Sequence, residues 1–395
     1  MSKINNLIKE LCPNGVRYYK LSEIGNQYSG LSGKSKNDFE NGNCKYITYT
    51  NIYNNPSTNL DVEDYVQVKE NEKQNEIKYK DILVAGSSEN LEDSGMISVV
   101  TKEPNEKIYL NSFCFGFRLN DIFYDKYNPD FLKHLFRDKN FRNEIISCSF
   151  GVTRYNLSKE KFLKIRIPCP PLEVQQEIVQ ILDKFGELEA ELEAELEARK
   201  SQYEFWRGKL FNNDSECLRL GDLCSIKTGS KPKEILEIGK YEYINAGTSN
   251  SGYVSEINAK GDCVTTPSRG QGGIGYVGFQ RNDFWCGPLC YQIRSLTDKL
   301  LNRYLYYYML TNSDYILGLK HEGGVPAVNV KELQEMPILL PSLEEQNHIV
   351  SSLDRFDKLI NDISVGLPAE IELRRKQYEY YRNKLLSFEE LSISE

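Results

Sequence analysis

The chain lacks the features of a secreted, membrane-spanning or zinc-binding protein. It contains no run of 18 apolar residues, and its first residues, MSKINNLIKELC, include no apolar segment that would direct secretion. Its ten cysteines are scattered without a C-x-x-C pair, and it has only three histidines, so neither a disulfide scaffold nor a zinc cluster is indicated. The sequence therefore predicts free thiols in a reducing cytoplasm.

The chain also lacks an excess of basic residues. Its 49 Lys and Arg against 57 Asp and Glu give a net charge of −8, which excludes a polybasic protein as a description of the whole chain. The acidity is concentrated in residues 167–211 and 337–395, with net charges of −5 and −4, whereas residues 1–166 and 212–336 carry +2 and −1. Because acidic side chains repel phosphates, only the two long segments are candidates for binding nucleic acid.

No catalytic motif stands out. The segment Tyr28–Ser35 resembles a phosphate-binding loop but has Tyr28 where the motif requires glycine. Gly270–Gly275 fits G-x-G-x-x-G, yet the next residues have the pattern of a strand and not of the required helix. Motifs of amino-methyltransferases, helicases and nucleases are missing. The sequence thus predicts a non-catalytic protein, with a length that suits two or three domains.

An internal repeat organises the chain. LEVQQEIVQILDKF from Leu172 recurs as LEEQNHIVSSLDRF from Leu343, and QYEFWRGKL from Gln202 recurs as QYEYYRNKL from Gln377. The second copy is four residues longer between these two matches. Upstream, a weaker match aligns residues 150–156 with residues 323–329. We interpret the chain as a tandem duplication in which a mixed domain is followed by a helical segment in each half.

Each helical segment carries one apolar stripe. In the first, apolar residues recur every three or four positions from Ile178 to Leu210, after a start at Pro170-Pro171. It contains three ELEA blocks, residues 187–198. The second is interrupted at Gly366-Leu-Pro368. A lone stripe must be buried, so we expect the two helices to pair, and the chain direction then makes them antiparallel. Two separate helices, each packed on its own domain, are the alternative.

The predicted fold is α+β, with two tandem pseudo-symmetric α/β domains joined by two long antiparallel helices in a coiled coil. The expected segments are an N-terminal segment packing near the C-terminal helix (residues 1–20), a first recognition domain (21–167), a central helical spacer (168–211), a second recognition domain (212–336) and a C-terminal helical region (337–395).

Polar, glycine-rich loops with cations occur at matching places in the two long segments. Arg, Lys, Asn and Gln on loops can contact base edges, and Ser or Thr can bind phosphates. Each loop alone is more typical of a solvated turn, and only the recurrence at equivalent positions favours a role in binding. The candidate DNA-binding residues are Lys34, Ser35, Asn51, Ser87, Ser88, Arg154, Lys227, Lys231, Arg269, Gln271 and Lys320.

The helix entries PCPPLEVQQEI (from Pro168) and PSLEEQ (from Pro341), with the exits QYEFWRGKL and QYEYYRNKL, resemble the specificity subunits of type I restriction–modification systems. The resemblance covers essentially the whole chain. It implies two target-recognition domains that each read half of a bipartite double-stranded DNA site, and bacterial or archaeal cytoplasm as the location. It also implies two modification subunits as docked partners, and restriction–translocase subunits that join them.

The same resemblance implies that S-adenosylmethionine, ATP and Mg²⁺ bind to the partner subunits, with no cofactor or metal on this chain. We expect the ELEA run to set the length of the unread gap in the DNA site. Aromatic residues near the helix exits are candidates for contacting the partners, because such rings recur in interface hot spots. They are Tyr203, Phe205, Trp206, Tyr378, Tyr380 and Tyr381.

Two other functions remain open on the sequence. The chain could be a coiled-coil tether whose two heads bind proteins or glycans. It could also be a stand-alone methyltransferase, which the missing catalytic motifs disfavour. Adenosylmethionine binding by the isolated chain would separate the methyltransferase from both other readings.

Overall fold

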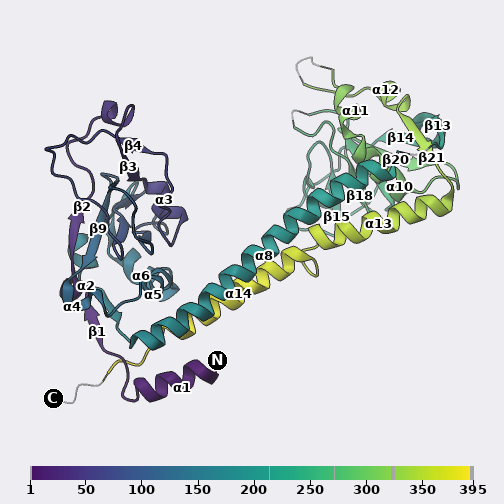
Figure 1. The fold of residues 1–395 in the computed structure, drawn as a ribbon. Helices are drawn as coiled ribbons and strands as arrows, with labels where there is room; N and C mark the ends of the chain where they lie inside the picture. Colours follow the sequence, from purple (N-terminus) through teal and green to yellow (C-terminus); the bar gives the residue numbers. More distant parts are fainter. Residues whose placement is uncertain (1, 213, 271, 322–324, 392–395) are drawn as a thin grey trace. The chain divides into compact units, whose positions relative to one another are not determined.

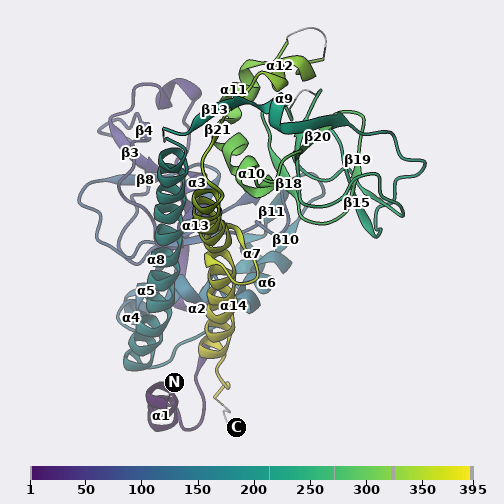
Figure 2. The same ribbon diagram turned by 90° about the vertical axis from the view of Figure 1, so that its right-hand side faces the viewer.

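The computed structural model describes residues 2–212, 214–270, 272–321 and 325–391 (Figures 1 and 2). The chain forms two compact units. Unit 1 contains the residues up to Glu191 together with those from Glu372 onward, and unit 2 contains Leu192–Ile371. These borders cut across α8 (Leu172–Leu210) and α14 (Leu367–Leu386), whereas the segment borders expected from sequence lie outside both helices. The segment boundaries therefore stay predictions.

Unit 1 is built on a four-stranded antiparallel sheet. Its elements are α1 (Ser2–Leu11), β1 (Tyr18–Lys20), α2 (Leu21–Ile24), β2 (Gly25–Ser29), η1 (Lys36–Phe39), β3 (Cys44–Ile47), α3 (Tyr49–Asn54), β4 (Tyr65–Val66), β5 (Ile82–Ala85), β6 (Ser87–Ser88), β7 (Ile97–Val99), β8 (Ile108–Leu110), β9 (Cys114–Leu119), α4 (Asp121–Tyr124), α5 (Pro129–Leu135), α6 (Lys139–Ser147), β10 (Ser149–Phe150), β11 (Tyr155–Leu157), α7 (Lys159–Phe162) and β12 (Arg166–Pro168). The main sheet has the order β2-β9-β5-β7, and smaller sheets have the orders β4-β3-β8, β10-β11-β6 and β1-β12. Its largest core cluster joins the main sheet to α5, α6 and the start of the next helix, α8 (Leu172–Leu210).

Unit 2 repeats this plan. Its elements after α8 are β13 (Glu216–Arg219), α9 (Leu220–Leu223), β14 (Cys224–Thr228), β15 (Tyr241–Ile244), β16 (Tyr253–Val254), β17 (Cys263–Pro267), β18 (Gly278–Gln280), β19 (Trp285–Cys286), β20 (Cys290–Ser295), α10 (Asn302–Thr311), α11 (Ser313–Gly318), α12 (Val330–Gln334), β21 (Pro337–Leu340), α13 (Leu343–Asn361) and the start of α14 (Leu367–Leu386). The sheets β14-β20-β17-β18, β16-β15-β19 and β13-β21 match their unit 1 counterparts strand for strand. A parallel strand pair recurs as well, as β3 with β8 and as β15 with β19. The predicted duplication and mixed α+β fold are confirmed.

The long helices pack together, as Figures 1 and 2 show. In unit 1, Phe185 on α8 stacks on Tyr381 of α14 with ring centroids 5.4 Å apart, and the Glu189 carboxylate accepts a hydrogen bond from Arg375 at 2.5 Å. The later residue on α8 thus meets the earlier residue on α14, so the helices are antiparallel, as predicted. The alternative of two separate core helices is excluded in this unit.

In unit 2, α8 packs against α13. The Tyr203 ring lies 6.2 Å from Phe356, and the stripe residues Leu196 and Leu210 join the same core cluster as Ile349. These are the positions that the three- and four-residue spacing of the stripe selects, so the helical pattern and the packing agree.

The second helical region is broken where the sequence predicts. Helix α13 ends at Asn361 and α14 begins at Leu367. Helix α8 is continuous over 39 residues. The break between Asn361 and Leu367 therefore accommodates the four additional residues of the second copy without disturbing the helical repeat on either side.

The two chain ends meet in unit 1. The Val16 N–H donates to the Glu389 carbonyl at 2.8 Å, and the Leu391 N–H donates to the Val16 carbonyl at 2.9 Å. Gly15 has a φ of +97°, and a Cβ at that position would lie 2.7 Å from the Glu389 carbonyl oxygen. Glycine is therefore required for this close approach.

Candidate nucleic-acid interface

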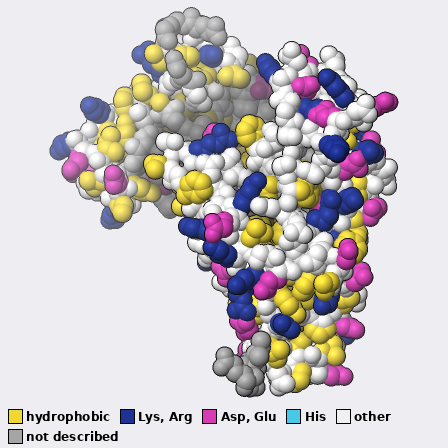
Figure 3. Space-filling view, turned by 90° about the vertical axis from the view of Figure 1, so that its left-hand side faces the viewer, with side chains coloured by type: hydrophobic (Ala, Val, Ile, Leu, Met, Phe, Trp, Pro, Cys, Tyr) yellow, Lys and Arg dark blue, Asp and Glu magenta, His cyan; other side chains and the backbone are white. Residues whose placement is uncertain are grey.

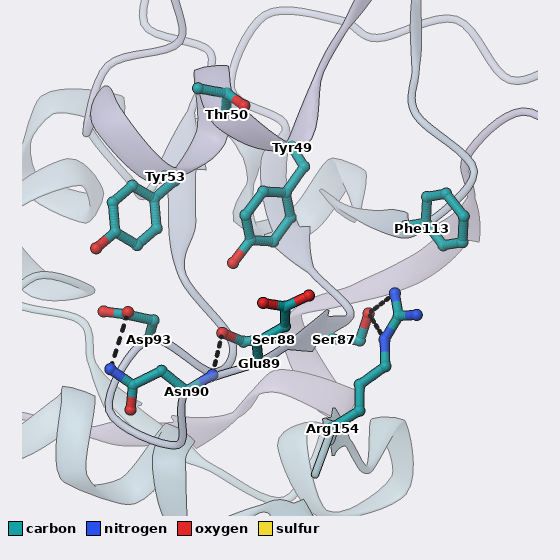
Figure 4. Close-up of a pocket in the computed structure, with 10 residues that line it drawn as sticks. All are labelled: Tyr49, Thr50, Tyr53, Ser87, Ser88, Glu89, Asn90, Asp93, Phe113 and Arg154. Atoms are coloured by element: carbon teal, nitrogen blue, oxygen red, sulfur yellow. Dashed lines mark hydrogen bonds between the residues drawn. The ribbon is translucent and has the colours of Figure 1, made fainter. Parts of the chain in front are cut away.

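One edge of unit 1 brings together three of the candidate residues, Arg154, Ser87 and Ser88. This arginine precedes β11, which pairs with β6, and its Nε and Nη2 donate to the Ser87 hydroxyl at 3.3 and 3.0 Å (Figure 4). The guanidinium carbon also lies 5.5 Å from the centre of the Phe113 ring. Ser88 is buried, and its hydroxyl accepts from the Asn90 N–H at 3.2 Å. Ser87 thus orients the arginine, and Ser88 shapes the loop that follows.

Arg154 borders a cavity of about 520 Å³ in unit 1. Tyr49 and Tyr53 from α3 stack along one wall with ring centroids 6.3 Å apart. Glu89 and Asp93 bring carboxylates to the cavity from the loop after β6. The site therefore combines an oriented cation, aromatic surfaces and two acidic groups.

Unit 2 has an equivalent edge with a different residue arrangement. In unit 1, Asn156 pairs with Phe150 and with Ser87. In unit 2, Ala327 pairs in the same way with His321 and with Arg269. Arg269, which is exposed, therefore occupies the place of Ser87.

This register corrects the alignment expected from sequence. Matching residues 150–156 with residues 323–329 placed Asn156 opposite Asn329. In the structure Asn329 instead caps α12, as Ser158 caps α7, so the sequence match was wrong by two residues. Two asparagines in similar loops produced the match, but only one of them is a helix cap. The structural equivalent of Arg154 is consequently Val325.

Two other candidates in unit 1 support its own loops. The Lys34 ammonium is almost fully buried and binds Glu72 at 2.6 Å, and this contact lowers the pKa of the Glu72 carboxyl to about 2. Asn51 is buried, donates to the Asn59 carbonyl at 2.8 Å and accepts from the Asn59 N–H. Ser35 is exposed and caps η1. Because these internal bonds engage the Lys34 and Asn51 side chains, neither side chain is available to contact DNA.

The remaining candidates lie in unit 2. Lys227 is exposed on β14, opposite Gln292 of β20, and Lys231 is exposed in the loop that follows β14. Lys320 is half-buried between α11 and the His321 bridge. Gln271 lies outside the described residues. The structure therefore places Arg269 at the edge equivalent to that of Arg154. Lys227 lies on β14, and Lys231 lies in the loop that follows this strand.

The surface of unit 1 is mixed in charge. Figure 3 shows Lys and Arg side chains scattered among acidic and apolar ones over the face in view. This agrees with the near-neutral charge of the long segments. It favours DNA contact through oriented side chains such as Arg154 over contact through a broad basic patch.

The aromatic candidates on the helices fall into two groups. Tyr203 is buried and Tyr378 is half-buried in the helix pairing, and Tyr381 stacks on Phe185. Phe205, Trp206 and Tyr380 are exposed by 62%, 38% and 59%. Lysine side chains lie over these exposed rings, Lys209 on α8 and Lys384 on α14. The exposed group repeats once per unit.

A match to the model of a protein family identifies the family of this chain. The model of the type I restriction modification DNA specificity domain matches residues 13–198 and again residues 212–373. The chain belongs to the type I restriction–modification specificity subunits. As a DNA specificity subunit of such a system it is a non-catalytic component, and the methyltransferase and tether readings are excluded. Membership places it in a type I complex that acts on DNA with modification subunits.

Curated relatives agree. The chain is 33% identical over 290 residues to a putative type I restriction enzyme specificity subunit of Haemophilus influenzae, an alignment that covers 67% of this chain and 73% of the relative. It is 34% identical over 258 residues to the EcoR124I/EcoR124II specificity subunit of Escherichia coli, covering 57% and 63% of the two chains.

Solved structures share the specificity-subunit fold. One from a study of assembly and conformational transition of the type I system aligns with a TM-score of 0.68 at 17% identity, over 95% of this chain and 98% of the other. The S subunit of M. genitalium aligns with a TM-score of 0.55 at 16% identity, over 94% and 96%.

Sequence reasoning did not assign a role to two glutamines of the specificity subunit. Gln175 is fully buried; its Oε1 accepts from the Asn128 N–H, and its Nε2 donates to the carbonyls of Lys126 and Pro170, all within 2.8 Å. Gln346 makes the same three contacts in unit 2, with Leu301, Lys299 and Pro341. Their match in the helical repeat was the available signal.

Two repeated aspartates fasten α8 and α13 to the mixed domains. Asp183 accepts from His134 Nε2 at 2.8 Å and from Lys133 at 2.9 Å, and these contacts, that of His134 first, lower the pKa of the Asp183 carboxyl to about 2. In unit 2, Asp354 accepts instead from Arg303 and from the Tyr307 hydroxyl at 2.6 Å. The position is conserved between the units, but the donors differ in kind.

Over the described residues, no cluster of three or more metal-ligating side chains is found. No helix within the described ranges is long and apolar enough to cross a membrane.

Proposed function

We propose that each unit reads one half of a bipartite DNA site through the edge that carries its arginine. The observation that carries this proposal is the repetition of one frame with an arginine at the same edge, Arg154 in unit 1 and Arg269 in unit 2. Ser87 lies at the edge of Arg154 and completes the proposed DNA-facing set there, with Ser35, Ser88, Lys227, Lys231 and Lys320 as outlying members.

We also propose that α8 sets the unread gap between the half-sites. The border between the two units falls inside the ELEA run, at Glu191 and Leu192. Each four-residue block adds about 6 Å and a rotation of about 40° to a helix. The break between α13 and α14 already accommodates four extra residues, so it can take up a change in the length of α8.

The exposed rings are proposed to dock the modification subunits. Phe205 and Trp206 on α8 and Tyr380 on α14 form one aromatic patch per unit, each accompanied by a lysine. Two equivalent patches suit two copies of the same partner. Those partners would bind S-adenosylmethionine, and the restriction subunits that join them would use ATP and Mg²⁺. No cofactor role is assigned to this chain.

The test is co-expression with the modification subunit encoded beside it, followed by sequencing of methylated adenines in the host DNA. We expect methylation at one split motif with a fixed gap. Deletion of one ELEA block, residues 191–194, should change the gap and leave both half-sequences intact. A formed complex that adds no methylation, or a deletion that alters the half-sequences, would contradict the proposal.

Docking is tested separately by a pull-down of the modification subunit. Trp206→Ala should weaken capture, because an exposed interface ring is lost. Ile363→Ala, which alters another exposed apolar residue, is the matched control. Full capture with Trp206→Ala would show that this ring serves only the helix.

A further inference from the structure

The cavity beside Arg154 has a composition that selects among DNA groups. Its lining combines one guanidinium, two carboxylates and three aromatic rings, all within unit 1 (Figure 4). We propose that this cavity reads a single G·C base pair in the major groove, with Arg154 on the guanine and Glu89 on the cytosine. The inference rests on the proposed function and specifies what unit 1 recognises.

Arg154 is held in one orientation. The Ser87 hydroxyl accepts from Nε and Nη2, and the Phe113 ring lies under the guanidinium at 5.5 Å. These contacts engage Nε and Nη2 on one side of the guanidinium, and Nη1 lies on the side opposite Ser87, where Figure 4 draws no hydrogen bond to it. Guanine presents two acceptors, O6 and N7, which an arginine fork binds together. Ser87 is therefore a positioning residue for Arg154.

Of the two carboxylates that line the cavity, that of Glu89 is available to accept a hydrogen bond from DNA. Asp93 is engaged by the Asn90 amide at 3.2 Å and by the Tyr53 hydroxyl, whose pKa is raised chiefly by the Asp93 charge. Glu89 is exposed and, among the residues that the structure describes, makes no hydrogen bond or ion pair. In Figure 4 its carboxylate lies beneath Tyr49, with Ser87 between it and the Arg154 guanidinium.

These features argue against a phosphate as the ligand of Arg154. Two carboxylates in the same cavity repel a phosphate, whereas a carboxylate accepts from the exocyclic amino group of cytosine. They also argue against adenine. Asn90, the residue type that binds adenine with both side-chain atoms, donates to Asp93 and accepts from the Glu92 N–H at 3.1 Å. Its amide is committed to the loop, so the pair of Arg154 with Glu89 remains, and it matches G·C.

The experiment uses the complex with its modification subunits and reads the methylated motif by sequencing. The wild-type half-site that responds to unit 1 variants should contain a G·C pair. Arg154→Ala should reduce the preference for that pair by about 5- to 150-fold. Glu89→Gln, which keeps the size and removes the charge, should admit base pairs other than G·C at that position. Glu10→Gln, exposed on α1, is the matched control and should leave the motif unchanged.

The outcomes separate this inference from the proposed function. A wild-type complex without a split motif would overturn the proposed function itself. A split motif that neither variant alters would overturn only the base-pair assignment. A uniform loss with Arg154→Ala on all sequences would make Arg154 a phosphate contact and also overturn the assignment. The half-site read by unit 2 is an internal control for folding and assembly of each variant.

Discussion

The two units agree in their frames and differ at their reading edges. The buried glutamines Gln175 and Gln346 make the same three hydrogen bonds, and three sheets of unit 1 recur strand for strand in unit 2. At the edge, by contrast, Arg154 corresponds to Val325, and Ser87 corresponds to Arg269. In unit 1 the arginine precedes β11. In unit 2 it follows β17, on the other side of the equivalent strand pairing. The buried contacts that hold the edge in place are repeated in both units, whereas the residues at the edge differ. The residues that read DNA can therefore change without loss of the shared fold.

The largest effect should come from breaking the shared frame. Gln175→Leu or Gln346→Leu removes three hydrogen bonds and leaves buried backbone groups unpaired, at about 1–3 kcal/mol each. We expect each variant to lower the free energy of unfolding by about 3–9 kcal/mol and to act on the transition of its own unit. Calorimetry of the full chain measures this. Equal loss in both units from one substitution would show that the frames are not independent.

The sequence predicts the frame better than the edge. The repeat from Leu172 and Leu343, with its helical spacing, is enough to predict α8, α13 and the break before Leu367, because apolar periodicity is a local signal. The burial of Asn51 and the pairing of Lys34 with Glu72 depend on loops far apart in sequence, so residue type alone suggested exposed contacts. The loop register failed for the same reason.

The reading edges can be compared by removing the arginine of unit 2. Arg269→Ala should cost about 1–3 kcal/mol of binding on the correct half-site of unit 2 and leave the half-site of unit 1 unchanged. Binding of the complex to duplexes with one altered half-site gives both values. A similar loss on both half-sites would contradict the assignment of one edge to each half-site.

The contacts of the long helices with the two mixed domains, His134–Asp183 in unit 1 and Arg303–Asp354 in unit 2, should respond differently to acid. Burial lowers the pKa of His134, so the folded state binds fewer protons than the unfolded state below about pH 6.5. Unit 1 should therefore lose stability as the pH falls from 7 to 5, by at most about 1.4 kcal/mol per pH unit. The low pKa of Asp183 contributes only at more acidic pH. In unit 2, Arg303 stays charged and shows no such step.

Thermal unfolding at several pH values tests this difference. His134→Gln keeps a neutral donor near Asp183 and should remove the step in unit 1, which separates His134 from the other acidic groups of the chain. Equal pH dependence of the variant and the wild type would assign the step elsewhere.

The smallest expected effect concerns the helix caps beside the edges. Ser158→Ala and Asn329→Ala each remove an equivalent cap, on α7 and α12, and should cost about 1 kcal/mol in their own units. Thermal unfolding measures the cost, and the methylated motif should not change. A changed half-site would show that the cap positions the reading loop as well as the helix.

The meeting of the chain ends bears on synthesis at the ribosome. Unit 2 is one continuous stretch, Leu192–Ile371, whereas unit 1 needs residues from Glu372 onward, including the partners of Val16. At about 5–20 residues per second, unit 1 waits roughly 10–40 s after its first part is made. The half that is second in sequence is consequently the first whose residues are all present. Residues 372–391 must therefore be made before Val16 and the first part of α8 can meet their partners in unit 1.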